Sequence, residues 1–171
     1  PASVWVGDMT DFRLSRPVDA AFNMINSFRH LLDEESACRH LELVAEALRP
    51  GGIYVLGLHL TPTRGTPMDE ESWSARRGHL VVNSRLWTQR RDRRRRVEVC
   101  GMVYDVYTPT RHIRLTDEIT FRMYTWPQFR QLLAKVPALD ICAVHDFAYD
   151  LETQIRLKAT TEDVVFVLRK T

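Results

Sequence analysis

Apolar and polar positions in the first 60 residues follow the pattern of a parallel sheet covered by helices. Two runs, residues 3–6 and 18–24, are almost continuously apolar, which is typical of strands covered on both faces. After Asp33, a plausible N-cap, apolar residues recur at spacings of three and four, which predicts a helix. Residues 50–52, Pro-Gly-Gly, are expected to end this helix, and residues 53–58 to form a buried strand. This order indicates a mostly parallel sheet.

The middle of the chain changes to alternating apolar and polar residues. Three runs, residues 79–90, 95–107 and 112–124, show this period of two, which predicts antiparallel strands joined as hairpins. Residues 61–78 are rich in proline, threonine, glycine and charged side chains, so we expect a loop there. Together these segments predict an antiparallel insertion over residues 61–121.

The last 50 residues return to a mixed pattern. Thr125 and Pro127 are suited to the start of a helix, and the apolar stripe that follows predicts one. Residues 140–145 and 164–168 are expected to form two strands, an antiparallel pair at a sheet edge. The sequence therefore predicts an α/β fold with a mixed sheet in residues 1–60 and 122–171, interrupted by the antiparallel insertion.

Composition narrows the class of protein. The chain has 171 residues, of which 44% are apolar and 27% charged, the balance of one soluble globular domain. No apolar run approaches the roughly 20 residues of a membrane span, and the first residues lack the pattern of a signal peptide. We therefore expect a cytoplasmic protein without a membrane partner. The net charge of +2 is too small to indicate a nucleic-acid partner by itself.

Cysteine and histidine spacing argues against a disulfide framework and against a metal site. Cys38, Cys100 and Cys142 lie far apart, with no C-x-x-C pair. The six histidines show no spacing of the H-x-x-x-H or H-E-x-x-H kind. We assign no metal.

Four segments, in this order and spacing, resemble one enzyme family. They are "VGDMTDF", "VDAAFNMINSFRHLLDEESACRHLELVAEALRPGGIYVLGLHL", "MYTWPQFRQLLA" and "EDVVFVLRK". Together they are similar to the middle and end of class I S-adenosylmethionine-dependent methyltransferases, in the small-molecule subgroup with an antiparallel insertion. The resemblance implies a Rossmann-like three-layer sandwich, S-adenosyl-L-methionine as cofactor and a small-molecule methyl acceptor.

The resemblance also implies that part of the family's domain is missing. In the family a glycine-rich turn after the first strand wraps the methionine part of the cofactor, and no G-x-G-x-G motif occurs in this chain. By comparison the chain starts at the third of seven strands, which the family arranges in the order 3-2-1-4-5-7-6. We therefore expect a truncated domain with weak or no activity alone. Residues 18–24 would then carry an unpaired apolar edge, where a homo-oligomer can form.

The resemblance places candidate cofactor residues at two strand ends. Asp8 would accept a hydrogen bond from the adenine amino group, and Met9 would pack against the adenine ring. Asn23, Met24 and Ile25 would line the methionine part and the transferred methyl group. The alternative for Asp8 is that its side chain caps a turn through the local backbone.

Candidate substrate residues follow these strands. The resemblance places Asn26 and Ser27 toward the substrate, and Arg122 and Tyr124 beside the pocket, where the insertion ends. His59, at a strand end, can act as a base or orient a substrate. The alternatives are that Asn26 and Ser27 satisfy local backbone groups and that His59 is a hydrogen-bonded structural residue. No catalytic acid–base pair is expected, because the sulfonium methyl group is already activated and the protein's task is alignment.

A run of arginines from Arg85 to Arg96 carries seven positive charges against the single acid Asp92. We expect a solvated hairpin turn, although arginines with an aromatic residue also suit phosphate contacts. This leaves two functional hypotheses. One is a small-molecule methyltransferase, and the other is a non-catalytic module of the same fold that contacts nucleic acid or an anionic partner through this hairpin.

Overall fold

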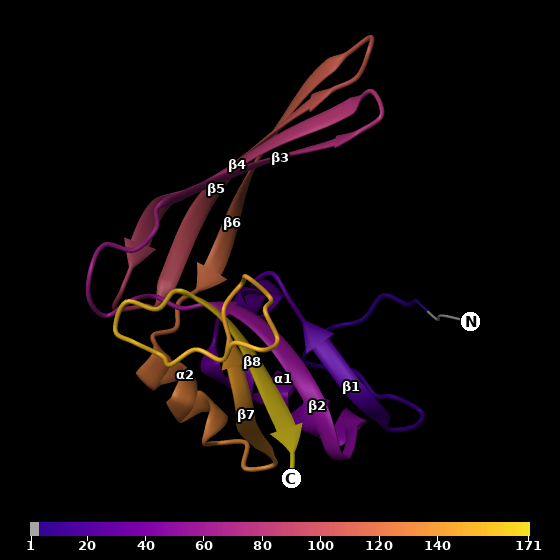
Figure 1. The fold of residues 1–171 in the computed structure, drawn as a ribbon, viewed down its shortest axis with the longest axis vertical. Coiled ribbons are helices and arrows are strands. Elements are labelled where there is room, and N and C mark those ends of the chain that lie inside the picture. The colour runs from indigo at the N-terminus through magenta and orange to yellow at the C-terminus, as the bar shows by residue number, and fades with distance from the viewer. Residues whose placement is uncertain (1–3) are drawn as a thin grey trace. The chain divides into compact units, whose positions relative to one another are not determined.

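The computed structural model describes residues 4–171, which fold into two compact units (Figure 1). The core unit comprises the chain up to Gly65 and from Tyr124 to Thr171, and the insertion unit comprises Thr66–Met123. The sequence had placed the insertion at residues 61–121. Each unit has its own β-sheet, and each is described separately below.

The core unit contains a four-stranded mixed sheet in the order β1-β2-β8-β7. β1 runs parallel to β2, whereas the β2–β8 and β8–β7 pairs are antiparallel. This confirms the predicted α/β fold with a mixed sheet. Its elements are β1 (Val18–Asn23), a short 3-10 helix η1 (Ser27–His30), α1 (Glu34–Ala47), β2 (Leu48–His59), α2 (Trp126–Leu133), β7 (Leu139–His145) and β8 (Asp163–Lys170).

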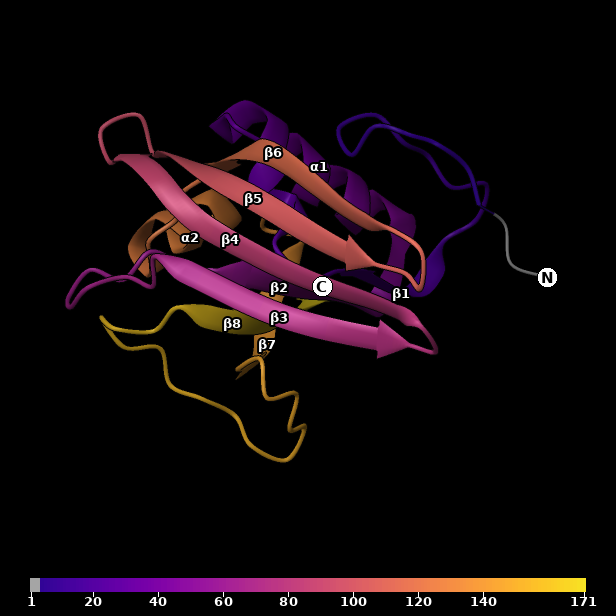
Figure 2. The same ribbon diagram turned by 90° about the horizontal axis from the view of Figure 1, so that it is seen from above.

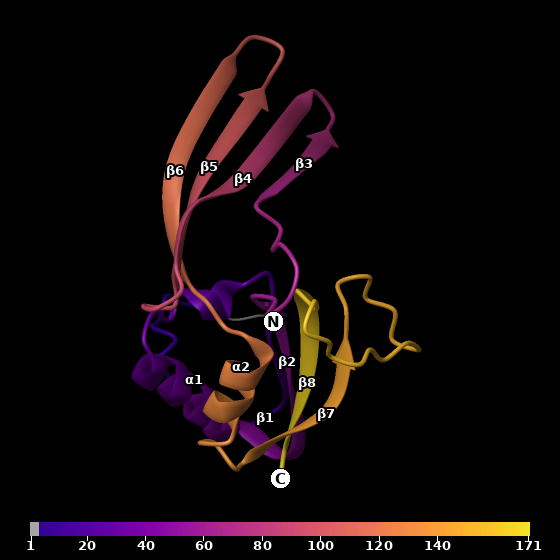
Figure 3. The ribbon, with the colours of Figure 1, turned by 90° about the vertical axis from the view of Figure 1, so that its left-hand side faces the viewer.

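Both α-helices begin as their sequences predict. Asp33 caps α1 by accepting a hydrogen bond from the backbone N–H of Ser36, at 2.7 Å. Thr125 and Gln128 form a reciprocal capping box at the start of α2. The two helices lie on the same face of the sheet (Figure 3), so the described residues form two of the three layers expected. The core between them is rich in aromatic rings, with Phe28, Tyr124, Phe129 and Phe166 fully buried.

The strand predicted at residues 3–6 is wrong over Val4–Val6, and Ser3 lies outside the described residues. Val4 and Val6 are 95% and 102% exposed, and neither pairs with a strand. An apolar run forms a strand only where a neighbouring strand satisfies its backbone, and none lies beside this segment in the described chain. β1 is also less covered than predicted, because Phe22 is 81% exposed on this edge strand.

The Pro-Gly-Gly segment belongs to a strand rather than to a helix end, which corrects the prediction. α1 ends at Ala47, and β2 begins at Leu48 directly afterwards. The pairing of β1 with β2 is irregular between Val18 and Ala20, opposite this segment. Gly51 has a φ of +78°, which favours glycine, and a Cβ at Gly52 would lie 2.9 Å from the carbonyl oxygen of Arg49. The two glycines therefore shape an irregular strand start.

The insertion unit is a four-stranded antiparallel sheet in the order β3-β4-β5-β6 (Figure 2). Its strands are β3 (Glu70–Arg77), β4 (Leu80–Asp92), β5 (Val97–Tyr107) and β6 (His112–Arg122). The predicted hairpins are confirmed, and residues 93–96 form the turn between β4 and β5. The sequence predicts a loop over residues 61–78, but β3 lies within it. The pattern did not indicate this strand, because its eight residues are all exposed and carry no continuous apolar pattern.

The two ends of the insertion are joined within the core unit. The backbone N–H of Thr61 donates a hydrogen bond of 2.7 Å to the carbonyl oxygen of Tyr124. Thr61 follows β2, and Tyr124 precedes α2, so this bond fixes the distance between the segments that lead into and out of the insertion. None of the helices within residues 4–171 is long and apolar enough to cross a membrane.

Gly52→Ala is expected to destabilise the protein, because the new Cβ would meet the carbonyl oxygens of Arg49 and Asp19 at 2.9 and 3.1 Å. Backbone cannot retreat as a flexible side chain does, so the loss should be about 1–3 kcal/mol in urea unfolding. Gly7→Ala is the matched control, since its Cβ would make only ordinary contacts, at 3.7 Å with the Trp5 ring. Equal unfolding free energies for the two variants would contradict this account of Gly52.

Candidate functional site

Asp8 lies in an exposed turn before β1. Its Oδ1 accepts hydrogen bonds from the backbone N–H and the hydroxyl of Thr10, at 2.7 and 2.8 Å. These bonds, the backbone one first, hold the pKa of the Asp8 carboxyl below its usual value. Asp8 therefore does cap a local turn, as the alternative reading has it. The carboxylate remains exposed, so a contact with the cofactor stays a prediction.

A buried histidine on α1 fixes the position of the neighbouring Met9. His40 Nδ1 lies 2.9 Å from the carbonyl oxygen of Met9, and its Nε2 lies 2.9 Å from the hydroxyl of Tyr54. Because a carbonyl only accepts, Nδ1 carries the proton and Nε2 accepts from Tyr54. Burial lowers the pKa of His40, although the bond to Met9 opposes this. A neutral His40 thus ties the Asp8–Met9 segment to the core.

Asn23 ends β1 beside the same segment. Its side-chain nitrogen lies 3.7 Å from the sulfur of Met9, which brings together two residues predicted to bind the cofactor. Burial raises the pKa of the Tyr54 hydroxyl, and a hydrogen bond with Asn23 lowers it again in part. The side-chain oxygen of Asn23 is buried without a hydrogen-bond partner among residues 4–171. Buried acceptors are normally satisfied, so this oxygen can accept a bond from a ligand.

The chain after β1 takes an unusual backbone conformation. Ile25 and Asn26 both have positive φ, at 56° and 64°. Asparagine tolerates this region, but a β-branched isoleucine there is strained, by about 1–3 kcal/mol. Ile25 is 79% exposed, so its side chain has little packing with the protein to compensate for this strain. Met24, just before it, contacts the position that a Cβ on Gly57 would occupy, at 3.1 Å.

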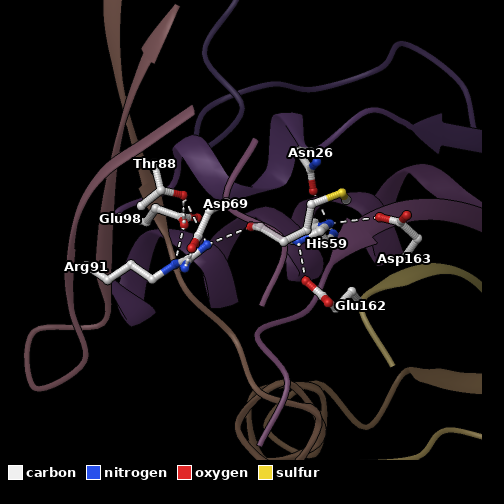
Figure 4. Close-up of polar contacts among 9 residues, drawn as sticks. Asn26, His59, Asp69, Thr88, Arg91, Glu98, Glu162 and Asp163 are labelled. Atoms are coloured by element: carbon white, nitrogen blue, oxygen red, sulfur yellow. Dashed lines mark hydrogen bonds and ion pairs between the residues drawn. The ribbon is translucent and has the colours of Figure 1, made fainter. Parts of the chain in front are cut away.

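Asn26 and Ser27 both bond backbone groups through their side chains. Asn26 Oδ1 accepts a hydrogen bond of 2.6 Å from the backbone N–H of His59, and so joins the turn after β1 to the end of β2 (Figure 4). The hydroxyl of Ser27 donates to the carbonyl oxygen of Met24 at 3.3 Å. The Ser27 bond is the local backbone contact weighed as an alternative, whereas the backbone partner of Asn26 is 33 residues away in the chain. Ser27 is exposed and Asn26 half-buried, and their substrate roles stay predictions.

His59 lies between two carboxylates from the start of β8 (Figure 4). Nδ1 is 2.8 Å from Asp163 Oδ1, and Nε2 is 3.3 Å from Glu162 Oε2. Carboxylates only accept, so in each contact it is the ring nitrogen that donates when it carries a proton. The His59 side chain thus joins the end of β2 to the start of β8, and both of its ring nitrogens face acids.

The structure places Arg122 and Tyr124 away from any exposed surface, each in its own unit. Arg122, at the end of β6, is 8% exposed. Tyr124 is 0% exposed, and its ring packs against Phe28 and Phe129 at centroid distances of 5.8 and 6.2 Å. A substrate contact at either residue stays a prediction without support from the geometry.

Two arginines of the arginine-rich segment are held by acids of the insertion unit. Arg91 pairs with Glu98 at 2.6 Å and with Asp69, and it also bonds the hydroxyl of Thr88 (Figure 4). Arg85 makes two hydrogen bonds of 2.7 Å to Glu70. Arg85 is exposed despite this pairing, and the other exposed arginines of the segment lie at or next to the β4–β5 turn: Arg90, Arg93, Arg94 and Arg95. The predicted solvated hairpin turn is confirmed.

The residues brought together in the core unit thus come from the ends of β1 and β2, from α1 and from the Asp8–Met9 segment. Sequence reasoning missed His40, Glu162 and Asp163. A signal for His40 existed, since it lies four residues before Val44 on the apolar face of the predicted helix. Within residues 4–171, no three or more histidine, cysteine, aspartate or glutamate side chains are placed so that they could hold a metal ion.

Comparison with known proteins identifies the fold. No protein-family model matches the sequence, and no curated protein matches it. Among solved structures, the chain is similar to an S-adenosylmethionine-dependent methyltransferase from Clostridium acetobutylicum, with a TM-score of 0.73 and 13% identity over 96% of this chain. An amino pentose methyltransferase from Micromonospora echinaspora gives a TM-score of 0.69 and 18% identity over 96% of the chain. A sugar N-methyltransferase from a Streptoalloteichus species gives a TM-score of 0.68 and 15% identity over 96% of the chain.

The chain spans 63%, 63% and 61% of the lengths of these three proteins. At identities below one in five, the similarity establishes the fold rather than the activity. It extends over nearly all of this chain, the core unit and the insertion included. The protein has the fold of the corresponding part of an S-adenosylmethionine-dependent small-molecule methyltransferase, as the sequence predicted.

His40 should make the stability of the protein pH-dependent. Because the pKa of His40 is lowered in the folded state, the unfolded chain binds the proton first as the pH falls below about 6.5. Stability is therefore present above pH 6.5 and is lost as the pH falls through the folded pKa. In urea unfolding at pH 7.5 and 5.5, His40→Gln should show a smaller loss than the unsubstituted protein. His79→Gln, an exposed turn residue, is the control, and an unchanged pH dependence in His40→Gln would refute this role.

Asn26 offers a test of the link between β1 and β2. Asn26→Gly keeps a residue suited to positive φ but removes the acceptor of the His59 N–H, whereas Asn26→Asp keeps an acceptor. Hydrogen exchange of the His59 amide should be about fivefold faster in Asn26→Gly, which corresponds to the loss of roughly 1 kcal/mol typical of one hydrogen bond. Little change is expected in Asn26→Asp. Equal acceleration in both variants would show that the side chain does not hold the amide.

Proposed function

We propose that this chain is the corresponding part of an S-adenosylmethionine-dependent methyltransferase that acts on a small-molecule acceptor. The observation that carries the proposal is the fold, which matches solved methyltransferases over 96% of the chain. Two of these proteins are named as an amino pentose methyltransferase and a sugar N-methyltransferase, which supports a small polar acceptor here. On this proposal the chain alone has weak or no activity.

The residues at the end of β1 fit the cofactor in part. Asp8 offers an exposed carboxylate for the adenine amino group, and Asn23 offers a buried oxygen with no donor in the described chain. Met9, Met24 and Ile25 supply apolar and sulfur surface beside these acceptors. In contrast, the 171 residues hold no glycine-rich turn for the amino-acid end of the cofactor. The chain therefore supplies one side of a cofactor site.

The cofactor, when bound, supplies an electrophilic methyl group, so the protein needs to align an acceptor rather than to activate the methyl. The chain's own residues serve this alignment. Asn26 joins the ends of β1 and β2, and His40 holds Met9 beside Asn23. His59 is occupied by two carboxylates, so we assign it a positioning role at the substrate end. Ser27, Arg122 and Tyr124 stay proposed substrate residues on the resemblance alone.

The alternative of an anion-binding module is less well supported. Of the seven arginines, Arg85 and Arg91 pair with acids, and Arg95 lies 3.7 Å from Asp92. Nucleic-acid affinity arises from charges that release counterions, and a paired arginine contributes little of this. The remaining exposed charges lie on one turn of a chain whose net charge is +2.

The proposal predicts a weak, localised binding of S-adenosylhomocysteine to the chain. In amide NMR spectra of the ¹⁵N-labelled protein, millimolar ligand should shift the signals of residues 8–10 and 23–26. Asn23→Ala removes the proposed acceptor and should weaken binding about tenfold, as the loss of one hydrogen bond does. Asn83→Ala, an exposed asparagine of the insertion unit, is the matched control. An unchanged spectrum at 5 mM ligand, or shifts confined to the insertion unit, would contradict the proposal.

A further inference from the structure

The sheet of the insertion unit carries a hollow on one of its faces, called the polar hollow below. Directly paired residues share a face of a sheet, and successive residues along a strand point to opposite faces. The hollow has a volume of about 370 Å³, which lies within the range of small-molecule sites. Two neighbouring rows of paired residues line it, Ser72–Arg85–Val103 and Ser74–Asn83–Asp105–Arg114.

The polar hollow has an apolar floor. Val103, on the central strand β5, is only 6% exposed. Arg85 on β4 and Arg114 on β6 flank β5 with long side chains, whereas Ser72 and Ser74 on β3 are short. Short side chains beside long ones leave open space above the floor. The carbon skeleton of a small ligand can lie on Val103, with polar groups around it.

Two acids lie on this face, and each is already engaged by the protein. Glu70, next to Ser72 on the same face, accepts two hydrogen bonds of 2.7 Å from Arg85. These bonds hold the pKa of the Glu70 carboxyl below its usual value. Asp105 Oδ1 lies 2.8 Å from Nε2 of His112, and Nε2 is the donor because a carboxylate only accepts. The other oxygen of Asp105, Oδ2, accepts no hydrogen bond within residues 4–171.

Several donors at the polar hollow, in contrast, are unused. The side-chain oxygen of Asn83 accepts a bond of 2.8 Å from the Ser74 hydroxyl, so the Asn83 NH₂ group is its donor side. Neither this NH₂ group nor the Ser72 hydroxyl makes a hydrogen bond in the described part of the chain. Arg114 has a long ion pair, 4.0 Å from its Nε to Asp105, and no hydrogen bond among the described residues. The hollow therefore offers N–H and O–H donors and a guanidinium charge.

This set of donors suits an oxyanion. A guanidinium can bind a carboxylate or a phosphate through two parallel N–H bonds, and such charge-assisted bonds are about twice as strong as neutral ones. Asn83 and Arg114 lie two strands apart, about 10 Å between their backbones. A small molecule across this distance can meet both donors. Asp105 Oδ2 lies on the strand between them, where it can accept a bond from a ligand hydroxyl.

We propose that the polar hollow binds a small hydroxylated oxyanion, which is a carboxylate or a phosphate ester whose carbon skeleton carries hydroxyl groups. Arg114 and the Asn83 NH₂ group donate to the ligand, its carbon skeleton lies on Val103, and a hydroxyl group of the ligand donates to Asp105. The inference uses residues of the insertion unit alone. It does not depend on the proposed methyltransferase activity.

The test is amide NMR of the ¹⁵N-labelled full chain, which also reports the side-chain NH₂ signal of Asn83. The probes are glycerol phosphate, glycerate and glycerol, which share a three-carbon skeleton, each at about 20 mM and constant ionic strength. At least one of the two anions should shift the signals of residues 72–74, 83–85, 103–105 and Arg114, and the tighter one identifies the preferred oxyanion. Glycerol should leave these signals in place.

Three outcomes of this titration would overturn the proposal. The first is that neither anion shifts the signals of the polar hollow. The second is that the shifts are confined to residues 93–96, where exposed arginines of the β4–β5 turn attract any anion. The third is that glycerol produces the same shifts as the anions, which would show that the charge is not recognised.

Substitutions separate the polar hollow from a general attraction of anions. Arg114→Gln removes the guanidinium and should weaken binding of the preferred anion about tenfold, whereas Arg111→Gln removes the same charge outside the hollow and should change binding less than about twofold. Asn83→Asp replaces the free NH₂ group by an acceptor of the same size and should weaken binding at least tenfold. Unchanged signals of the core unit check that each variant is folded. Equal weakening by Arg114→Gln and Arg111→Gln would contradict a site at the hollow.

Discussion

The packing of α1 and α2 against alternate residues of β2 and β8 is the constraint on which the core unit depends. The buried residues Tyr54, Leu56 and Leu58 on β2 face the helices, as do Val164, Phe166 and Leu168 on β8. This packing also builds the candidate site. Because α1 lies on that face, His40 meets Tyr54 from the helix side and reaches the backbone of Met9. The position of an exposed turn is thus set from within the core.

Features encoded by neighbouring residues could be read from the sequence. The caps at Asp33 and Thr125 depend on side chains within three residues, and both were predicted. The strand β3 could not be predicted, because an exposed strand is specified by its pairing with β4 rather than by its own pattern. The helix end predicted at the Pro-Gly-Gly segment is wrong for a related reason. The composition of this segment is typical of a helix end, but the positive φ of Gly51 occurs within an irregular strand.

In the candidate site, too, the position of a residue could be predicted from its neighbours in the sequence, but its distant contacts could not. The sequence places Asn23 and His59 at strand ends and Asn26 in the turn that follows β1, and they lie there. It did not give the direction of the side chains, because their partners are remote in the chain. Asn26 points to the backbone of His59, and His59 itself is held by acids at the start of β8. The sequence predicts Tyr124 beside a pocket, but its ring packs in the core against Phe28 and Phe129.

The hydrogen bond between Thr61 and Tyr124 has a consequence for the evolution of this fold. Since the chain enters and leaves the insertion at two residues held together by the core itself, the core unit does not require the insertion to bring those residues together. To the core, residues 66–123 are one long connection between β2 and α2. Closing a loop costs little more free energy as the loop lengthens. Insertions of different size and specificity can therefore be exchanged at this point while the core keeps its own contacts.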